Sequence, residues 1–458
     1  MTDPYQCSLD FLYGRLNYER QGMPRVPGEL RLGRMRRLLR AMGDPQDGPP
    51  IVHVAGTKGK GSTAAMIAAA LTASGVRTGL FCSPHLHRLE ERFSVDGASA
   101  TADDLVALTD AVRPGVEATE ASGHRGPTFF EITTAMGLLH FARRGVGAVV
   151  LEVGLGGRLD STNAVRPAVA VVTNISYDHT RQLGTTLEAI AREKAGIFKR
   201  GRPAVSGERG PEAGAVIRAA ARQRRSPFRE IGADFTYESL PPRPPLKRPT
   251  AGRVAVRTWA RDWGELTLPL LGSHQAHNAA VALASLDVLG ERGLSVPREA
   301  VERGFAGLRW PARVEVMGES PWVVIDGAHN VASAAALAET LRTCFPPVAR
   351  TLVFGTTRDK DLRGQLRVLL PGADTVVVTR YVENPRAVPP EEVAEAVREL
   401  TGWEPIVTSD PTEALLVARR GTRPDGLICV TGSLFLAAEC RAVILGGAAA
   451  PVAGHVLL

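Results

Sequence analysis

Short apolar runs alternate with amphipathic stretches along most of the chain. The run 51–56 ends in glycine, and an alanine-rich stretch with helical spacing follows it over 60–74. Further apolar runs at 76–83, 147–153 and 168–174 show no polar alternation, and segments with helical spacing separate them. Strands of this kind, separated by helices, are typical of a parallel sheet that helices cover on both faces.

A proline-rich and basic segment at 240–253 interrupts this pattern. The runs 253–260 and 265–271 after it alternate apolar and polar residues, which predicts an antiparallel hairpin. A second set of apolar runs and helical stretches begins near Leu308, where we place a domain boundary. We therefore expect an α/β protein with a large parallel-sheet domain at 1–308 and a smaller, doubly wound, Rossmann-like α/β domain at 309–458. We expect the tail after Arg441 to be a last strand or a frayed end.

The charge and cysteine content narrow the function classes. The 458 residues include 55 Lys plus Arg and 48 Asp plus Glu, a formal charge of +7 that suits anionic small molecules as readily as nucleic acid. The sequence has no RNA- or DNA-binding motif and no apolar run long enough for a membrane span, so we expect neither partner. Five widely spaced cysteines without a CxxC pair argue against a disulfide framework or a zinc cluster and favour the cytoplasm.

A glycine-rich segment between a predicted strand and a predicted helix carries the strongest chemical signal. In AGTKGKGST, residues 55–63, glycines let backbone N–H groups surround phosphate oxygens, the helix N-terminus adds partial positive charge, and a lysine reaches the phosphates. The spacing departs from the usual G-x-x-x-x-G-K-[ST], and a simple glycine-rich turn is the alternative. We predict that this loop binds nucleotide phosphates through Thr57, Lys58, Gly59, Lys60, Gly61 and Ser62.

A magnesium ion is expected beside nucleotide phosphates, and Mg²⁺ takes oxygen ligands and few protein groups. The candidate ligands at the ends of predicted strands are Ser83, Glu152 and His179. Glu152 ends an apolar strand that turns into a glycine-rich loop, and ligands of such folds bind at the carboxyl edge of the sheet. The alternatives are a helix cap or a surface ion pair for Glu152, and a purely structural role for His179.

Many ordered motifs together resemble one family. HVAGTKGKGST, GLFCSPHL, TFFEITTA, LEVGLGGRLDSTN, LGSHQAHNAAVAL, WPARVE, DGAHN and TGSLFLA occur in the order seen in bacterial folylpolyglutamate synthases and dihydrofolate synthases. These enzymes belong to the Mur ligase superfamily of ATP-dependent amino-acid ligases. The resemblance covers residues 12–437, essentially the whole chain. It implies a first domain that binds ATP and the pterin-bearing substrate, and it favours a monomer.

The resemblance also implies roles for individual residues. Lys60 matches the family's P-loop lysine, and Ser83, Glu152 and His179 match its magnesium ligands. Lys194 matches a lysine that the family carboxylates with CO2, which supplies oxygen ligands for a second Mg²⁺; on sequence alone it is typical of a solvated helix residue. With Lys60 and Lys194, His329 completes the expected catalytic set.

Nucleotide and substrate contacts are implied in the same way. The nucleotide contacts are Asn278, Arg313, Asp326 and His329, so catalysis would need closure of the two domains; for Asp326 a helix cap is the alternative. The residues expected near the pterin-bearing substrate are Thr128, Phe129, Phe130, Glu131, Arg158, Leu159 and Asp160. The two phenylalanines would either stack on a flat ring or belong to the core.

The expected reaction adds L-glutamate to dihydropteroate, to the γ-carboxylate of a glutamylated tetrahydrofolate, or to both, through an acyl phosphate made with ATP. Two alternatives stay open: a Mur ligase that joins other substrates, and a P-loop protein whose ATP hydrolysis drives a conformational switch. Lys58 departs from the family, which usually has asparagine there. It would either tighten phosphate binding or point to solvent.

Overall fold

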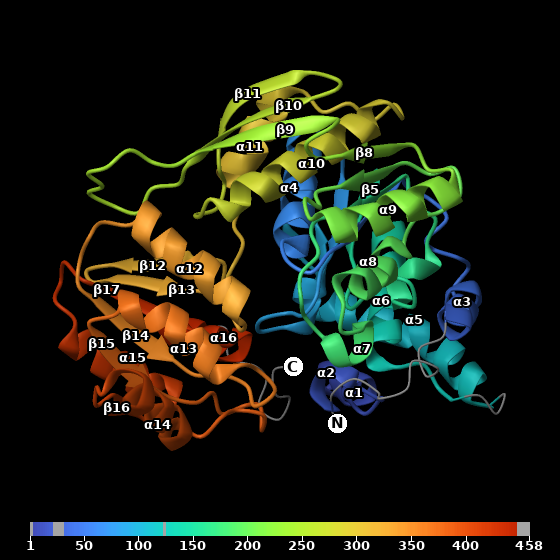
Figure 1. Ribbon diagram of the computed structural model, residues 1–458. Helices are drawn as coiled ribbons and strands as arrows, with labels where there is room; N and C mark the ends of the chain where they lie inside the picture. Colours follow the sequence, from blue (N-terminus) through green and yellow to red (C-terminus); the bar gives the residue numbers. More distant parts are fainter. Residues whose placement is uncertain (1–2, 22–31, 122–124, 447–458) are drawn as a thin grey trace.

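An eight-stranded sheet organises the first part of the protein in the computed structural model, which describes residues 3–21, 32–121 and 125–446 (Figure 1). The strand order is β4-β3-β2-β5-β1-β6-β7-β8, and all neighbours pair in parallel except β3 and β4, which form an antiparallel edge. The strands are β1 (Ile51–Ala55), β2 (Thr78–Phe81), β3 (Phe93–Val95), β4 (Ala98–Ser99), β5 (Ala148–Glu152), β6 (Val169–Val172), β7 (Ala204–Ser206) and β8 (Phe228–Glu230).

Helices cover both faces of this sheet because successive residues of each strand point to opposite sides. Val52 and Val54 of β1 join one core with the apolar residues of α4, α10 and α11, whereas Ile51 joins a second core with those of α1, α3, α5 and α6. A third core lies under α8 and α9, beside β6 and β7. These helices are α1 (Pro4–Tyr13), α3 (Leu32–Ala41), α4 (Lys60–Ala73), α5 (Ala102–Ala121), α6 (Phe129–Arg143), α8 (Leu187–Ala195), α9 (Pro211–Arg224), α10 (His274–Gly290) and α11 (Arg298–Gly307), with short α2 (Tyr18–Gln21) and α7 (Thr180–Leu183).

A small antiparallel sheet of order β11-β10-β9 packs on α10 at the top of the view in Figure 1. Its strands are β9 (Phe235–Leu240), β10 (Arg253–Thr258) and β11 (Asp262–Thr267), so the hairpin expected from the sequence is confirmed and a third strand precedes it. The segment between β9 and β10 reaches the second part of the chain, where the Thr250 N–H donates to the Cys344 carbonyl at 2.9 Å.

A six-stranded sheet, β12-β13-β17-β14-β15-β16, organises the remainder of the chain, and only β12 is antiparallel to its neighbour. Apolar residues of α12, α13 and α14 fill one face and those of α15 and α16 the other. The elements are β12 (Glu315–Glu319), β13 (Trp322–Ile325), α12 (Val331–Cys344), β14 (Arg350–Phe354), α13 (Leu362–Leu369), β15 (Thr375–Val378), α14 (Pro390–Thr401), β16 (Ile406–Val407), α15 (Pro411–Gly421), β17 (Leu427–Thr431) and α16 (Leu434–Ile444).

The expected α/β class, with a large parallel sheet and a second smaller sheet, is confirmed. Of the two alternatives for the tail, the strand is wrong where the tail is described, because α16 continues through Arg441 to Ile444; residues 447–458 lie outside the described ranges. All five cysteines are free thiols in this structure. Among the described residues, no helix combines the length and apolarity that crossing a membrane requires.

Candidate active site

Three adjacent strands end together at the candidate site. β1 lies between β5 and β6, with Val54 opposite Glu152 and Ala55 opposite Val172. β1 runs directly into the glycine-rich loop, and β5 ends at Glu152 itself. The parallel register therefore brings the loop and the carboxylate to the same edge of the sheet, as the sequence predicted.

The glycine-rich loop ends in a left-handed glycine at the start of α4. Gly59, the N-cap of α4, has a φ of +78°, and a Cβ there would lie 2.1 Å from Asn278 Oδ1. No side chain caps the helix, so its first N–H groups remain available to an anion. Lys60 Nζ folds back over the loop and donates to the Gly56 carbonyl at 3.1 Å. Thr57, Gly61 and Ser62 complete the loop, with Thr57 and Ser62 buried.

Lys58 does not point to solvent. Its Nζ lies 2.7 Å from Asp178 Oδ2, and Lys360 Nζ from the second part of the chain lies 4.0 Å from Asp178 Oδ1. Burial works against a charged Asp178, but Lys58, His179 and Lys360 together hold the pKa of this carboxyl below its usual range. Sequence reasoning missed both partners. Asp178 stands beside His179 in SYDHT and could have been noticed, whereas nothing local in the sequence connects Lys360 with the loop.

The three predicted metal ligands have different surroundings. Glu152 is only 6% exposed, and its Oε2 accepts a hydrogen bond from the Ser83 N–H at 3.3 Å, so these two residues are together. Burial raises the pKa of Glu152, while nearby Lys60 and Arg313 favour its charged form. His179 has a left-handed backbone with a φ of +49°, and burial lowers its pKa to about 4, which leaves a neutral imidazole at physiological pH.

A metal at this edge would have few protein ligands. In the described part of the chain, no group of three or more His, Cys, Asp or Glu side chains is arranged to hold a metal ion. Mg²⁺ commonly uses one or two carboxylates and takes its other oxygens from water and phosphate. The buried Glu152 carboxylate beside the phosphate loop therefore fits Mg²⁺ better than a metal that needs a complete protein cage.

Lys194 is not a solvated helix residue, contrary to what its local sequence suggests. The side chain is 4% exposed, and Nζ donates to the Gly56 carbonyl at 2.9 Å. Burial, with a further contribution from Lys60, lowers the pKa of Lys194 to about 7. The amine therefore lies against the phosphate loop and is largely uncharged just above neutral pH.

The predicted nucleotide contacts come from both parts of the chain. Asn278 is buried on α10 against Gly59, and its Nδ2 donates to Gln275 Oε1 at 2.8 Å. Arg313 lies on the connection before β12, flanked by Ala312 and Val314 with φ values of +53° and +49°. A β-branched residue in the left-handed region is strained, and such strain gathers at functional sites.

Asp326 and His329 support this connection from the second sheet. Asp326 accepts hydrogen bonds from the N–H groups of Val314 at 2.9 Å and Ala328 at 2.8 Å, while Asn330 caps α12, so the helix-cap alternative for Asp326 is wrong. His329 Nδ1 lies 2.9 Å from the Gly327 carbonyl. Burial lowers the pKa of His329 to about 3, and Lys58 and Lys360 contribute to this shift, so His329 faces the same group of charges.

Most residues of the first predicted substrate segment make structural contacts within the fold. Thr128 and Glu131 form a capping box at the start of α6, and Glu131 Oε2 also accepts from Arg34 Nε at 2.6 Å. The Phe129 ring is fully buried and stacked on Tyr13 with 5.2 Å between ring centroids, which makes it a core residue. Phe130 is half-buried and approaches the loop after β5, where a Cβ on Gly154 would lie 2.5 Å from its ring.

The second predicted substrate segment lies nearer the charged centre. Asp160 is buried and accepts hydrogen bonds from the N–H groups of Leu155 at 2.8 Å and Thr162 at 3.0 Å. Burial raises the pKa of Asp160, and its charge in turn acts on Lys194. Arg158 is exposed and paired with Glu193, and Leu159 is half-buried.

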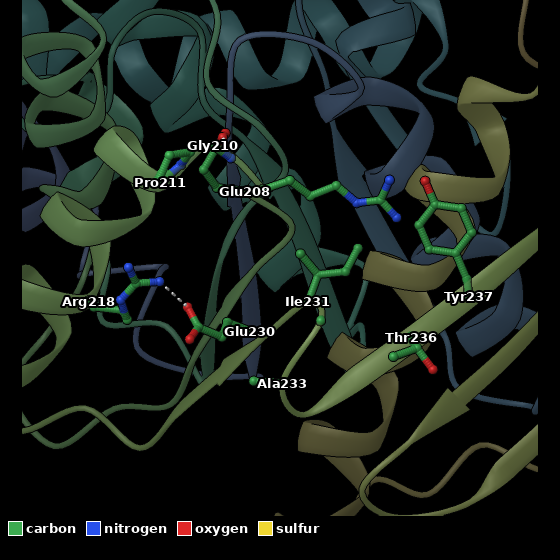
Figure 2. Close-up of a pocket in the computed structure, with 11 residues that line it drawn as sticks. Glu208, Gly210, Pro211, Arg218, Glu230, Ile231, Ala233, Thr236 and Tyr237 are labelled. Carbon is green, nitrogen blue, oxygen red and sulfur yellow. Dashed lines mark hydrogen bonds and ion pairs between the residues drawn. The ribbon is translucent and has the colours of Figure 1, made fainter.

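A separate cavity of about 530 Å³ lies at the ends of β7 and β8 (Figure 2). Its charges balance internally: Arg218 pairs with Glu230 at 3.0 Å, and Glu208 accepts hydrogen bonds from two backbone N–H groups. The Arg209 guanidinium stacks over the Tyr237 ring at 4.6 Å from its centroid. None of the residues predicted from the sequence lines this cavity, and its balanced charges indicate no particular class of ligand.

Comparison with known proteins agrees with this geometry. Residues 54–286 match the Mur ligase middle domain, and residues 312–434 match the Mur ligase glutamate ligase domain. The chain is 34% identical to the dihydrofolate synthase/folylpolyglutamate synthase of Bacillus subtilis, over 96% of this chain and 99% of that protein.

Solved structures give the same result. Folylpolyglutamate synthase of Mycobacterium tuberculosis, complexed with ADP, superposes with a TM-score of 0.85 at 33% identity, over 96% of this chain and 99% of that one. Escherichia coli FolC in complex with DHPP and ADP superposes with a TM-score of 0.83 at 30% identity, over 97% and 99%. The chain therefore belongs to the folylpolyglutamate synthase/dihydrofolate synthase family of Mur ligases.

Proposed function

We propose that this protein adds L-glutamate to dihydropteroate, to the γ-carboxylate of a glutamylated tetrahydrofolate, or to both, and uses ATP to do so. The observation that carries the proposal is the meeting of Lys60, Glu152 and Lys194 at one sheet edge, with Arg313 contributed by the connection to the second sheet. Relatives named for both synthase activities support an ATP-dependent glutamate ligase acting on folates.

The chemistry must convert a poor electrophile into a good one. An oxygen of the acceptor carboxylate attacks the γ-phosphorus of ATP, ADP leaves, and an acyl phosphate forms. The α-amine of glutamate then attacks the acyl carbon, the bond to phosphate breaks, and the amine loses a proton. Positioning and charge neutralisation are the protein's main contribution in phosphoryl transfer. Lys60 meets the terminal phosphates, and Arg313 offers a planar guanidinium that can bind two oxygens at once.

His329 and Asn278 would complete the nucleotide site. The Nδ1 of His329 faces a carbonyl oxygen and therefore carries the ring hydrogen, which leaves Nε2 as an acceptor. Asn278 lies beside Gly59 and would contact the adenine side of the nucleotide. Asp326 would act through the backbone that carries Arg313.

Magnesium fits this edge of the sheet. We propose that Ser83, Glu152 and His179 hold Mg²⁺, which would neutralise charge on the phosphate oxygens. The fit rests on a buried carboxylate beside the phosphate loop and on a neutral imidazole.

For Lys194 we propose carboxylation: the uncharged amine attacks CO2, a C–N bond forms and a proton leaves. The product would be an anionic oxygen ligand for a second Mg²⁺, and the enclosed position of Nζ against Gly56 supports it.

The pterin-bearing substrate would lie along the edge formed by Phe130, Leu159 and Asp160. Phe130 is the half-buried ring of its segment, while Thr128, Phe129 and Glu131 would act by holding the start of α6 in place. Arg158 is exposed and would reach the substrate only by leaving Glu193.

We further propose a domain boundary near Leu308, a cytoplasmic location and a monomeric state.

Phosphate release provides the test. Purified protein with ATP, MgCl2 and L-glutamate should release phosphate only when dihydropteroate or tetrahydrofolate is added, and the two acceptors assayed side by side show which reaction it catalyses. Activity only with an unrelated carboxylate would indicate another Mur ligase. Release of phosphate without any acceptor would indicate a nucleotide-driven switch and would contradict the proposal.

A further inference from the structure

A buried polar chain connects the strand before the phosphate loop with Asp160. His53 lies in the middle of β1, and its side chain is fully buried. Its Nε2 is 2.8 Å from Thr162 Oγ1, and this hydroxyl donates to Asp160 Oδ1 at 2.5 Å. A buried histidine between core valines destabilises the fold unless its polar atoms have hydrogen-bond partners. The contact with Thr162 supplies one such partner and connects His53 to Asp160.

The hydrogen count fixes the direction of this chain. Thr162 has one hydroxyl hydrogen and gives it to the Asp160 carboxylate, so His53 must be the donor to Thr162 and must carry its hydrogen on Nε2. Burial, with help from Lys199, lowers the pKa of His53 to about 3, so the ring is neutral. Its other nitrogen, Nδ1, is buried and has no hydrogen-bond partner among the described residues.

Asp160 is held from both oxygens. Oδ1 accepts the Thr162 hydroxyl and the Thr162 N–H, and Oδ2 accepts the Leu155 N–H. Burial raises the pKa of Asp160, and these three donors act against that effect and fix the rotation of the carboxylate. The lone pairs that remain are acceptors with a defined direction, near the side chains of Lys60 and Lys194.

We propose that His53 is a positioning residue for the reaction: through Thr162 it fixes the Asp160 carboxylate so that its free lone pairs accept hydrogen bonds from N–H groups of the pterin-bearing substrate. The proposal rests on the function proposed above, in which Asp160 belongs to the substrate site. Because His53 is on the strand that leads into the phosphate loop, the same strand would hold the acceptor and the nucleotide in register.

Paired variants test the chain. Thr162→Val removes the hydroxyl and keeps the shape, whereas Thr162→Ser keeps the hydroxyl; His53→Leu removes the donor, whereas His53→Gln retains an amide N–H. Thr109→Val is the matched control, since this buried hydroxyl donates only to Leu105 of its own helix. KM for the pteroyl acceptor, KM for ATP, kcat and the urea midpoint are measured for each.

We expect Thr162→Val and His53→Leu to raise the acceptor KM about tenfold or more, because a hydrogen bond to a charged group is disturbed. The ATP KM should change less than about twofold, and the serine and glutamine variants should recover most of the loss. Thr109→Val should leave both KM values unchanged.

The outcomes are separable. If wild-type protein is active but Thr162→Val, with a normal urea midpoint, keeps a normal acceptor KM, the positioning role is wrong and the proposed function stands. Parallel changes in both KM values and in the urea midpoint would indicate a structural role only, and would also overturn it. If the wild type shows no acceptor-dependent phosphate release, the proposed function fails and the role of His53 fails with it. His53→Leu is the more disruptive change, so Thr162→Val decides the question if His53→Leu does not fold.

Discussion

Lys194→Met should make the protein more stable and nearly inactive. Lys194 is 4% exposed and lies close to Lys60, so a charge on its amine destabilises the folded state. The lowering of its pKa from 10.5 to about 7 measures this cost in free energy. A shift of this size corresponds to about 5 kcal/mol below pH 7. Methionine has a similar length and no charge, and the Gly56 carbonyl keeps its hydrogen bond from Lys60.

The direction in which the free energy of unfolding changes with pH follows from proton binding. Between pH 7 and 10.5 the unfolded chain keeps the proton on Lys194 and the folded protein does not, so the stability of the wild type rises with pH across this window. The advantage of Lys194→Met in free energy of unfolding should therefore be about 5 kcal/mol at pH 6 and about 2 kcal/mol at pH 9.

Urea unfolding at both pH values measures this difference, in buffer with EDTA and without CO2 so that the amine stays unmodified and metal-free. Lys247→Met, at an exposed position, is the control and should change stability by less than about 0.5 kcal/mol. Phosphate release by Lys194→Met should fall about 100-fold or more if the residue helps to hold a catalytic ion. A variant that is less stable at pH 6, or a difference that does not shrink by pH 9, would refute the reasoning.

Three further predictions concern the same edge of the sheet. Glu152→Gln should lower turnover about 100-fold or more with an unchanged urea midpoint, and near-normal phosphate release would remove Glu152 from the metal site. Lys58→Asn should cost about 1 to 2 kcal/mol in urea unfolding, because Asp178 loses its 2.7 Å partner. Because the folded protein holds the pKa of Asp178 well below its usual range, this cost should be fully present above about pH 4 and should be lost only as the pH falls towards that depressed pKa. Gly59→Ala should raise the ATP KM and cost about 2 kcal/mol or more, since its φ is +78° and its Cβ would meet Asn278; normal values would contradict this geometry.

Much of the fold was predictable because it is local. Apolar runs without alternation identified β1, β5 and β6, and helical spacing over 60–74 identified α4. The sequence did not predict elements that are shorter or less apolar than these, such as β3 and β4 at the sheet edge and β9 before the hairpin. Edge and surface strands are half-solvated, so their sequences carry a weak pattern and their pairing depends on neighbours distant in the chain.

Part of the candidate site could likewise be predicted from local sequence, and part could not. The glycine-rich loop and Glu152 could be found because each follows directly from a strand end. Lys194 could be placed only by family resemblance, since its helix has ordinary surface composition and its burial comes from packing against the loop. Asp326 was named, but its role as the acceptor that holds Val314 required the fold.

The amino-acid sequence by itself determined the α/β class, the phosphate loop and membership of the ligase family, because these depend on residues that are consecutive or in a fixed order. Only the tertiary structure decided that Lys58 turns to Asp178 and that His53 reaches Asp160 through Thr162. Hydrogen bonds and pKa shifts depend on distance and on exclusion of water, and neither quantity exists until segments more than a hundred residues apart have packed together.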